Sequence, residues 1–396
     1  MAPSRTCLAS LILCALAVAA IPSGVVAQRG RADNPFPGGT NPDGSLRPTP
    51  PVNRLFTQDA YTEYAILAPG SEEFRIRFLP EETRVGATEL VNATRGGSQG
   101  SDIEVFDPRS GKPLEFTYQE EGSDTHAIHA RLPIPVPAGG VGRVLIYKTY
   151  KDPRTYMMHG DDIVWVRSLS GYRLGVLLPK GFAFISSNVA AQLTTSVDGR
   201  LKLAFANPSG QGNPVTIHAR RTTAVFAPRS DTDMFFDDVK TLYELDAPET
   251  GKIRVEQIYS DYRKGATARL DSLAYLPLQD LKVVDLDTAK PFTPAKEGSA
   301  TVVKLDVPIV DEKQSAHLKV TGTIADGSYK AANGELVFER ALRGLRNTIL
   351  LPAGWDVSAV SQSGTIGTYE GRAFVALIDL NAENNYKVTI RARRRS

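Results

Sequence analysis

Apolar and polar residues alternate with a period of two over many short stretches of the chain. The clearest are 74–78 (Phe-Arg-Ile-Arg-Phe), 201–205 (Leu-Lys-Leu-Ala-Phe) and 215–218 (Val-Thr-Ile-His). Such alternation predicts strands that are buried on one side. Turn-forming dipeptides such as Asp198-Gly199 and Asn333-Gly334 lie between stretches of this kind. Because no segment shows the period of about 3.6 that an amphipathic helix requires, the sequence predicts an all-β protein.

The chain also repeats itself over a long period. The block 177–182 (Leu-Leu-Pro-Lys-Gly-Phe) returns at 350–355 (Leu-Leu-Pro-Ala-Gly-Trp), 173 positions later (350 − 177). The same offset relates 164–167 to 337–340 and 215–220 to 388–393, while earlier matches such as Tyr64 with Tyr243 are 179 apart (243 − 64). Self-similarity of this length indicates a tandem duplication, with the change of offset absorbed by small insertions in loops.

Each repeat is expected to divide into two parts. The first part has about the strand count of an immunoglobulin-like or fibronectin-like β-sandwich, and a long β-ribbon from Arg143 towards Met158 is expected to join it to a smaller β-subdomain. Trp165 aligns with Phe338 and Phe182 with Trp355, which indicates packed core positions. The predicted organisation is a signal peptide (1–27), a Pro/Gly-rich extended leader (28–54), the first sandwich (55–150) and small subdomain (151–221), a linker (222–233), and the second sandwich (234–324) and small subdomain (325–396).

The first 27 residues have the composition of a secretory signal peptide. Arg5 precedes an apolar run, and Val-Val-Ala comes before Gln28, so cleavage is expected after Ala27. Both cysteines, Cys7 and Cys14, lie in this segment, and the mature protein is therefore expected to fold without disulfides. These features predict an exported protein, periplasmic, on the cell surface or secreted, with no transmembrane segment after cleavage.

The charge balance excludes one class of partner. The formal net charge of the whole chain is only +2, which provides no long-range attraction for nucleic acid. The basic C-terminus is consistent with a solvated strand end, although attachment to an acidic surface or polymer is a second interpretation.

The histidines and acidic residues offer several metal sites, each with a simpler explanation. None of the five histidines recurs at the matching position of the other repeat; His317, for example, aligns with Arg143. His126 and His129 have a zinc-like spacing, but on a strand they point to opposite faces. Met157-Met158-His159 could bind copper, and the acidic residues between Asp231 and Asp238 could bind calcium, yet neither stretch completes a known site. We therefore expect no metal and no cofactor.

Motifs for catalysis are also weak. The chain has no Gly-x-Ser-x-Gly, no thiol outside the signal peptide and no glycine-rich phosphate loop. Glu120 and Glu121 could pair with Asp161 and Asp162 as the two carboxylates of a glycosidase, but nothing in their spacing selects them. Asp107 and the matching Asp285 precede turns and are expected to shape them. No catalytic residue is assigned.

If the protein binds a ligand, the segment 147–156 is the best candidate. It places three tyrosines among basic residues, a composition that could stack on a glycan or hold a partner peptide. The alternative is that these tyrosines pack against the neighbouring subdomain. The expected ligand-binding residues are Tyr147, Tyr150, Arg154 and Tyr156.

Two functions remain open. The favoured one is an exported, non-enzymatic β-sandwich repeat protein, a binding or structural module of the cell envelope or extracellular space with a protein or glycan partner. The alternative is a hydrolase or metal enzyme that acts on an envelope or extracellular polymer, with one repeat degenerate. Clustering of Glu120, Glu121, His126 and Asp161 in one cleft would favour the alternative.

Overall fold

The computed structural model describes most of the chain after residue 59. The predicted signal peptide, the leader and the acidic stretch from Asp231 to Asp238 lie outside the described residues. We call residues 60–228 the first half and residues 239–395 the second half. The described ranges are 60–94, 98–121, 126–169, 173–206, 213–228, 239–271, 277–298, 300–344, 346–378 and 386–395.

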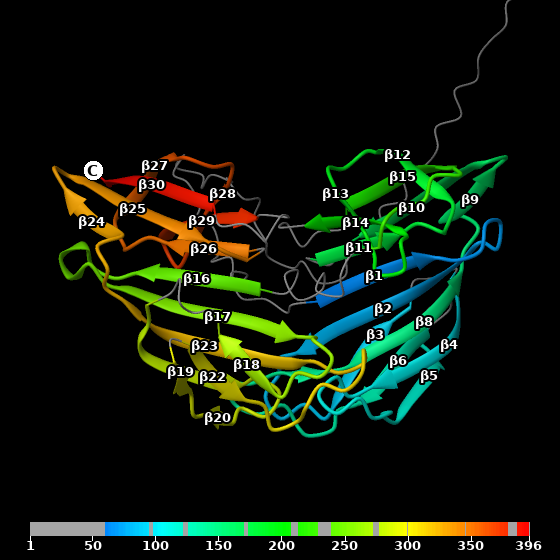
Figure 1. Cartoon of the computed structure of the whole chain (residues 1–396), viewed down its shortest axis with the longest axis horizontal. Coiled ribbons are helices and arrows are strands. Elements are labelled where there is room, and N and C mark those ends of the chain that lie inside the picture. Colours follow the sequence, from blue (N-terminus) through cyan, green and yellow to red (C-terminus); the bar gives the residue numbers. More distant parts are fainter. Residues whose placement is uncertain are drawn as a thin grey trace, which may run out of the picture. The chain divides into compact units, whose positions relative to one another are not determined.

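The predicted all-β class is confirmed. Within the described ranges, every regular element is a strand except one short 3-10 turn, Pro248–Thr250 (Figure 1). No helix in this part of the chain is long and apolar enough to cross a membrane.

The first half is built on one large sheet. Its strand order is β13, β14, β11, β1, β2, β8 and β4, and a short β7 also pairs with β2. β1 and β11 run parallel, whereas the other pairs are antiparallel. The strands are β1 (Ala60–Ile66), β2 (Glu73–Glu82), β4 (Gln99–Phe106), β7 (Gly142–Arg143), β8 (Leu145–Lys151), β11 (Arg173–Leu177), β13 (Gln192–Thr195) and β14 (Leu201–Ala206).

Two smaller sheets of the first half pack against the large one. Tyr64, Phe74 and Trp165 belong to a core between the large sheet and the sheet β12-β15-β10-β9, and Leu90, Val105 and Ile128 belong to a core between the large sheet and the sheet β3-β6-β5. These strands are β3 (Glu89–Ala93), β5 (Phe116–Glu120), β6 (His126–Arg131), β9 (Tyr156–His159), β10 (Asp162–Leu169), β12 (Phe182–Ser187) and β15 (Asn213–Arg221).

The second half has the same arrangement of sheets. Its large sheet has the order β20, β19, β23, β17, β16, β26, β29 and β28, and the smaller sheets are β24-β25-β30-β27 and β18-β22-β21. The strands are β16 (Val239–Leu245), β17 (Ile253–Asp261), β18 (Ala268–Asp271), β19 (Gln279–Asp285), β20 (Pro291–Phe292), β21 (Ala295–Glu297), β22 (Ala300–Lys304), β23 (Ala316–Ile324), β24 (Tyr329–Ala332), β25 (Glu335–Leu342), β26 (Arg346–Leu350), β27 (Trp355–Val360), β28 (Thr365–Tyr369), β29 (Arg372–Ile378) and β30 (Tyr386–Arg394).

The registers of the two halves also correspond. Trp165 pairs with Ile217 in the first half, and Phe338 pairs with Ile390 in the second, at the offset of 173 for both strands (338 − 165 and 390 − 217). The parallel pair β1 and β11 has its counterpart in the parallel pair β16 and β26. All four aromatic positions predicted to be core are buried, namely Trp165, Phe182, Phe338 and Trp355.

The expected β-ribbon between the two parts of a repeat is interrupted. β8 ends at Lys151 and β9 begins at Tyr156 in a different sheet. Asp152 shapes the intervening turn, because its carboxylate accepts hydrogen bonds from the Arg154 amide (3.0 Å) and the Thr155 hydroxyl (2.9 Å), and Pro153 has no amide hydrogen to continue a ladder. Coupling comes instead from the large sheet, which takes β11, β13 and β14 from beyond this turn.

Candidate functional site

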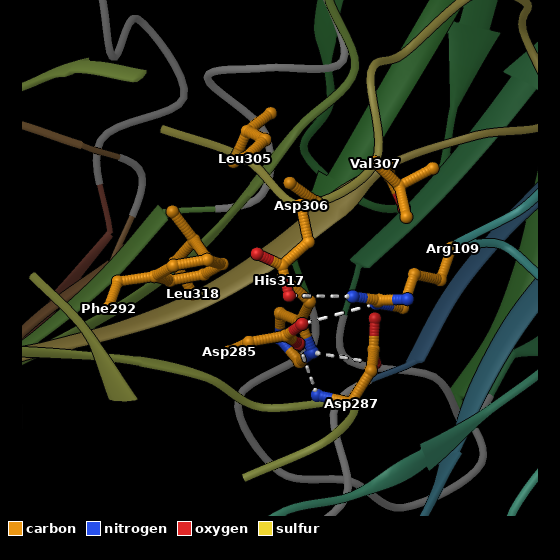
Figure 2. A pocket seen from close by; sticks show the side chains of 11 residues that line it. Arg109, Asp285, Asp287, Phe292, Leu305, Asp306, Val307, His317 and Leu318 are labelled. Atoms are coloured by element: carbon orange, nitrogen blue, oxygen red, sulfur yellow. Dashed lines mark hydrogen bonds and ion pairs between the residues drawn. The ribbon is translucent and has the colours of Figure 1, made fainter. Parts of the chain in front are cut away.

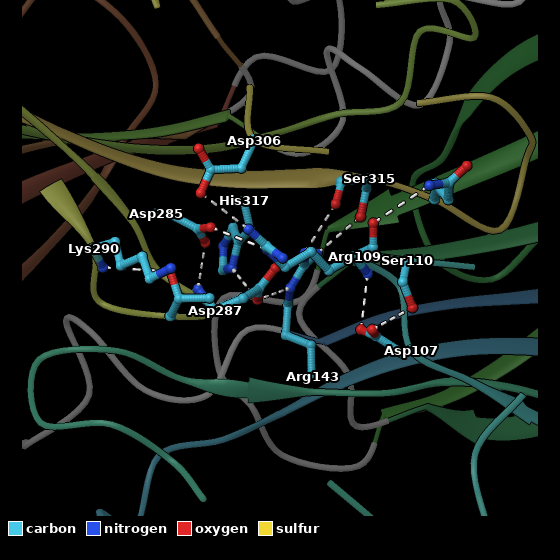
Figure 3. A network of polar contacts seen from close by, with 12 residues as sticks. Asp107, Arg109, Ser110, Arg143, Asp285, Asp287, Lys290, Asp306, Ser315 and His317 are labelled. Atoms are coloured by element: carbon cyan, nitrogen blue, oxygen red, sulfur yellow. Dashed lines mark hydrogen bonds and ion pairs between the residues drawn. The ribbon is translucent and has the colours of Figure 1, made fainter. Parts of the chain in front are cut away.

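A buried polar cluster lies where side chains of the first half meet side chains of the second. Its centre is Arg143 on β7, whose guanidinium binds the Asp287 carboxylate twice, with Nε 2.7 Å from Oδ1 and Nη2 2.6 Å from Oδ2 (Figure 3). Nη1 of Arg143 also donates to the Ser315 hydroxyl at 3.0 Å. Only 1% of the Arg143 side chain is exposed, so this is a desolvated, bidentate ion pair.

His317 extends the cluster on the other side of Asp287. It projects from β23, and its Nε2 lies 3.4 Å from a carboxylate oxygen of Glu81 on β2, while Nδ1 lies 3.8 Å from Asp287. Nδ1 is buried and has no hydrogen-bond partner among the residues that the structure describes. Burial alone would raise the pKa of Asp287, but the charge and hydrogen bonds of Arg143, with a smaller effect of His317, hold that pKa well below its usual range.

A second arginine of the first half reaches the same region. Arg109 Nε lies 3.1 Å from Asp285, and Nη2 lies 3.4 Å from Asp306 (Figure 2). The cavity that these side chains line with His317 has a volume of only about 20 Å³, close to the space that one water molecule needs. The cluster therefore has no room for a substrate, and its charges are used in holding the halves together.

The main-chain contacts across this junction come in related pairs. The Ser315 amide donates to the Pro108 carbonyl at 2.6 Å, and the Val141 amide donates to the Leu286 carbonyl at 2.8 Å. Ser315 lies 174 positions after Val141 (315 − 141), the offset between β8 and β23, and Leu286 lies 178 after Pro108 (286 − 108), the offset between Asp107 and Asp285. Each half thus presents the same backbone groups to the other, as in a twofold dimer interface.

The side chains at the junction depart from this symmetry. By the same offsets, the counterpart of Arg143 is His317, and the counterpart of Asp287 is Arg109. The strong ion pair therefore forms only once, between Arg143 of the first half and Asp287 of the second. The equivalent positions hold His317 and Arg109, which cannot form the same pair. Arg109 turns instead to Asp285 and Asp306, and His317 turns to Glu81.

The four residues predicted to bind a ligand do not share one surface. Tyr150 and Tyr156 are buried in the core of the first half, and the Tyr156 hydroxyl donates to the Ala68 carbonyl at 3.1 Å. Tyr147 points to the opposite face of the large sheet, beneath the Arg75 guanidinium, which lies 5.5 Å from its ring centre. Arg154 is on the turn, with 69% of its side chain exposed.

The other candidate residues are also dispersed. His126 stacks on Tyr118, whereas His129 lies between Glu89 (3.1 Å) and Glu121 (2.7 Å), whose hydrogen bonds raise the pKa of His129. Asp161 accepts a hydrogen bond from Arg221 on β15, which belongs to a different sheet from His126 and His129. No group of three or more His, Cys, Asp or Glu among the described residues is arranged to hold a metal ion.

Little in the amino-acid sequence indicated this junction. Asp107 and Asp285 do shape turns, as predicted: their carboxylates accept from the amides of Arg109 (3.0 Å) and Asp287 (2.9 Å). Their proximity in space was not predicted. The only available signal was the duplication itself, because a duplicated module can meet its copy through equivalent residues.

Comparisons with known proteins assign no family. Neither the models of known protein families nor the curated proteins contain a match to this chain.

Proposed function

We propose that this chain is an exported, non-enzymatic protein made of two copies of one β-sandwich module, and that it serves as a binding or structural module of the cell envelope or extracellular space. The observation that carries this proposal is the junction. Its buried charges are neutralised across the two halves, and its cavity is smaller than any substrate. Such a cluster fixes the two halves relative to each other, which is a structural role.

The placement of the acidic residues supports this proposal over the enzyme alternative. Glu120 pairs in register with His126, and Glu121 binds His129, but Asp161 is held by Arg221 on another sheet. A glycosidase needs two carboxylates that face one bond, roughly 5–10 Å apart. The described contacts supply no such convergence.

A groove on the second half is the surface that we assign to a protein or glycan partner. It has a volume of about 320 Å³ and crosses one face of the large sheet. Its lining combines apolar surface with side chains of both charges and two hydroxyl groups that can contact a flexible polymer: Glu244, Arg254, Glu256, Asp280, Lys282, Thr321 and Thr323. In the first half, the position equivalent to Thr321 is Tyr147 (321 − 174), which lies under Arg75.

Co-sedimentation with insoluble peptidoglycan and with neutral polysaccharide tests both readings in one assay. The proposal predicts that the protein pellets with at least one polymer and releases no soluble fragments. Thr321→Trp, which fills the groove, should reduce pelleting, whereas Tyr147→Trp at the equivalent position is the matched control and should not.

Two results would count against this function. Release of soluble sugar fragments that Glu120→Gln abolishes would establish the hydrolase instead. Protein that remains in the supernatant and releases nothing would contradict a binding role towards these polymers.

A further inference from the structure

The core of the first half contains two cations that no acidic residue in the described ranges neutralises. Lys148 on β8 is 4% exposed and Arg167 on β10 is 7% exposed. They come from facing sheets and meet at the ring of Tyr150, whose centre lies 5.0 Å from Lys148 Nζ and 5.4 Å from Arg167 Cζ. Buried charges are normally paired or bound to a ligand, because losing water is costly for an ion.

The partners of these cations are aromatic or neutral. Arg167 lies against three rings, those of Tyr64 and Phe74 (5.3 Å each) as well as Tyr150. Lys148 Nζ donates to the Asn92 side-chain oxygen at 2.6 Å. Neither residue forms an ion pair with any residue in the part of the chain that the structure describes. Cation–π contacts compensate only part of the lost hydration.

One donor of this pair is also unused. Arg167 Nη1 is buried and has no hydrogen-bond partner among the described residues. The buried Thr94 hydroxyl lies within hydrogen-bonding reach of Tyr150. Thr94 follows the end of β3, two positions after Asn92, and its amide still donates to the His126 carbonyl of the neighbouring strand at 2.6 Å. A group that accepts hydrogen bonds and carries negative charge would satisfy all of these requirements together.

The second half shows how the same scaffold neutralises its arginine. Arg340, the counterpart of Arg167 (340 − 173), binds the Asp326 carboxylate at 2.6 Å and the Ser328 hydroxyl at 3.0 Å. Asp152, the counterpart of Asp326 (326 − 174), is present in the first half but accepts from Ser98, Thr155 and the Arg154 amide instead.

The second half also lacks the lysine. Gly322 replaces Lys148 (322 − 174), and a Cβ atom there would already lie 2.8 Å from the Gln279 carbonyl. The cationic cluster is therefore a property of the first half and not of the fold.

We infer that Lys148 and Arg167 form a binding site for a small monovalent anion, either a halide ion or the carboxylate group of a small organic acid. The two cations supply the charge, the free guanidinium nitrogen supplies a hydrogen bond, and the aromatic walls limit the size of the ligand. This site is separate from the groove of the second half and does not rest on its function.

Quenching of tryptophan fluorescence by bromide and iodide tests the site directly. The chain has two tryptophans, so Trp355→Phe leaves only Trp165, which is fully buried and packs 5.4 Å from the Tyr64 ring. We expect quenching that saturates with halide concentration and that added formate competes away. Neutral acrylamide should quench little, since it has no charge to bind.

Variants assign the effect to named side chains. Arg167→Met and Lys148→Met in the Trp355→Phe background should each weaken halide affinity by about tenfold or more, because each removes one charged partner. Arg340→Met removes the equivalent arginine that already has its acid, and it should leave the affinity unchanged.

The possible results of these experiments distinguish a carboxylate site, a halide site and no site. Competition by formate identifies a site that accepts carboxylates, and saturation without competition identifies a halide site. Quenching that rises linearly without saturation, or that Arg167→Met leaves unaltered, would overturn the assignment. If a variant does not fold, the saturation and competition experiments on the Trp355→Phe protein alone still decide.

Discussion

Buried charges in this protein are of two kinds, and the difference decides what each residue contributes. Arg143 and Arg340 have carboxylate partners at 2.6 Å, Asp287 and Asp326 respectively. Lys148 and Arg167 have none among the described residues. Removing the partner of a buried, paired charge lowers the stability of the fold. A buried charge without a partner lowers stability already, until it binds an anion or loses its proton.

Lys148→Met should change the dependence of stability on pH. Burial, and then the charge of Arg167, lower the pKa of Lys148 to about 7. Between pH 7 and about 10 the unfolded chain keeps a proton that the folded protein has lost, so the free energy of unfolding of the wild type should rise with pH by up to about 1.4 kcal/mol per unit. In Lys148→Met this contribution should be missing.

Chemical denaturation from pH 6 to pH 10 at low halide concentration measures this difference. Lys151→Met, at an exposed position of the same strand, is the control and should retain the wild-type profile. Identical profiles for wild type and Lys148→Met would show that Lys148 keeps its proton throughout.

Arg143→Ala should be far more costly than its size suggests. It leaves the Asp287 carboxylate buried without its main partner, and we expect a loss of about 3–5 kcal/mol in the free energy of unfolding. The matched control is Arg220→Ala, which removes an equally short pair with Asp162 at an exposed site and should change the free energy of unfolding far less. Equal losses for the two variants would contradict a desolvated junction.

Asp287 makes the stability that this cluster contributes depend on pH in the acid range. Its pKa is lowered in the folded protein, so its contribution is fully present above the unfolded value of about 3.9 and is lost as the pH falls through the folded value. Asp287→Asn should remove this acid dependence, as measured by denaturation from pH 2 to pH 6. If Asp287→Asn leaves the decrease of stability below pH 4 unchanged, the ion pair between Asp287 and Arg143 is contradicted.

Strands were predictable because their signal is local. Alternation over residues 74–78 lies within β2, and the alternating stretch 215–218 lies within β15. Sheet membership is not local, which explains the error over the ribbon: nothing in the residues around Asp152 shows that β8 and β9 join different sheets. The Tyr150 and Tyr156 side chains were likewise ambiguous, since an aromatic residue beside basic ones is equally typical of a core and of a ligand site.

Equivalent elements of the two halves should respond equally to the same change. Leu178 and Leu351 follow β11 and β26, and both are fully buried. Replacing either with Ala should lower the free energy of unfolding by about 2–5 kcal/mol, because each leaves a cavity in a packed core. Leu193→Ala, at a position that is 48% exposed, should cost much less. A small effect at only one of the buried sites would argue against their equivalence.

At the scale of the whole molecule, the internal self-similarity was visible in the sequence, but the way in which the two halves meet was not. Offsets of 173 and 179 follow from matching letters, whereas the pairing of Val141 with Leu286 and of Ser315 with Pro108 depends on three-dimensional arrangement. Close packing supports this pairing, since a Cβ atom on Gly140 would lie 2.5 Å from the Leu286 carbonyl. The junction thus uses backbone contacts that both copies share, reinforced by an ion pair that exists in one direction.

Denaturant unfolding followed separately on Trp165 and Trp355 tests this central claim most directly. Trp355→Phe reports the first half and Trp165→Phe reports the second, and far-ultraviolet circular dichroism follows both. If the junction couples the halves, each tryptophan transition should coincide with the circular dichroism transition of the same variant, and adding Gly140→Ala or Arg143→Ala should separate them. Transitions that are already separate in the two tryptophan variants, and that Arg143→Ala does not move further apart, would contradict a coupled pair of modules.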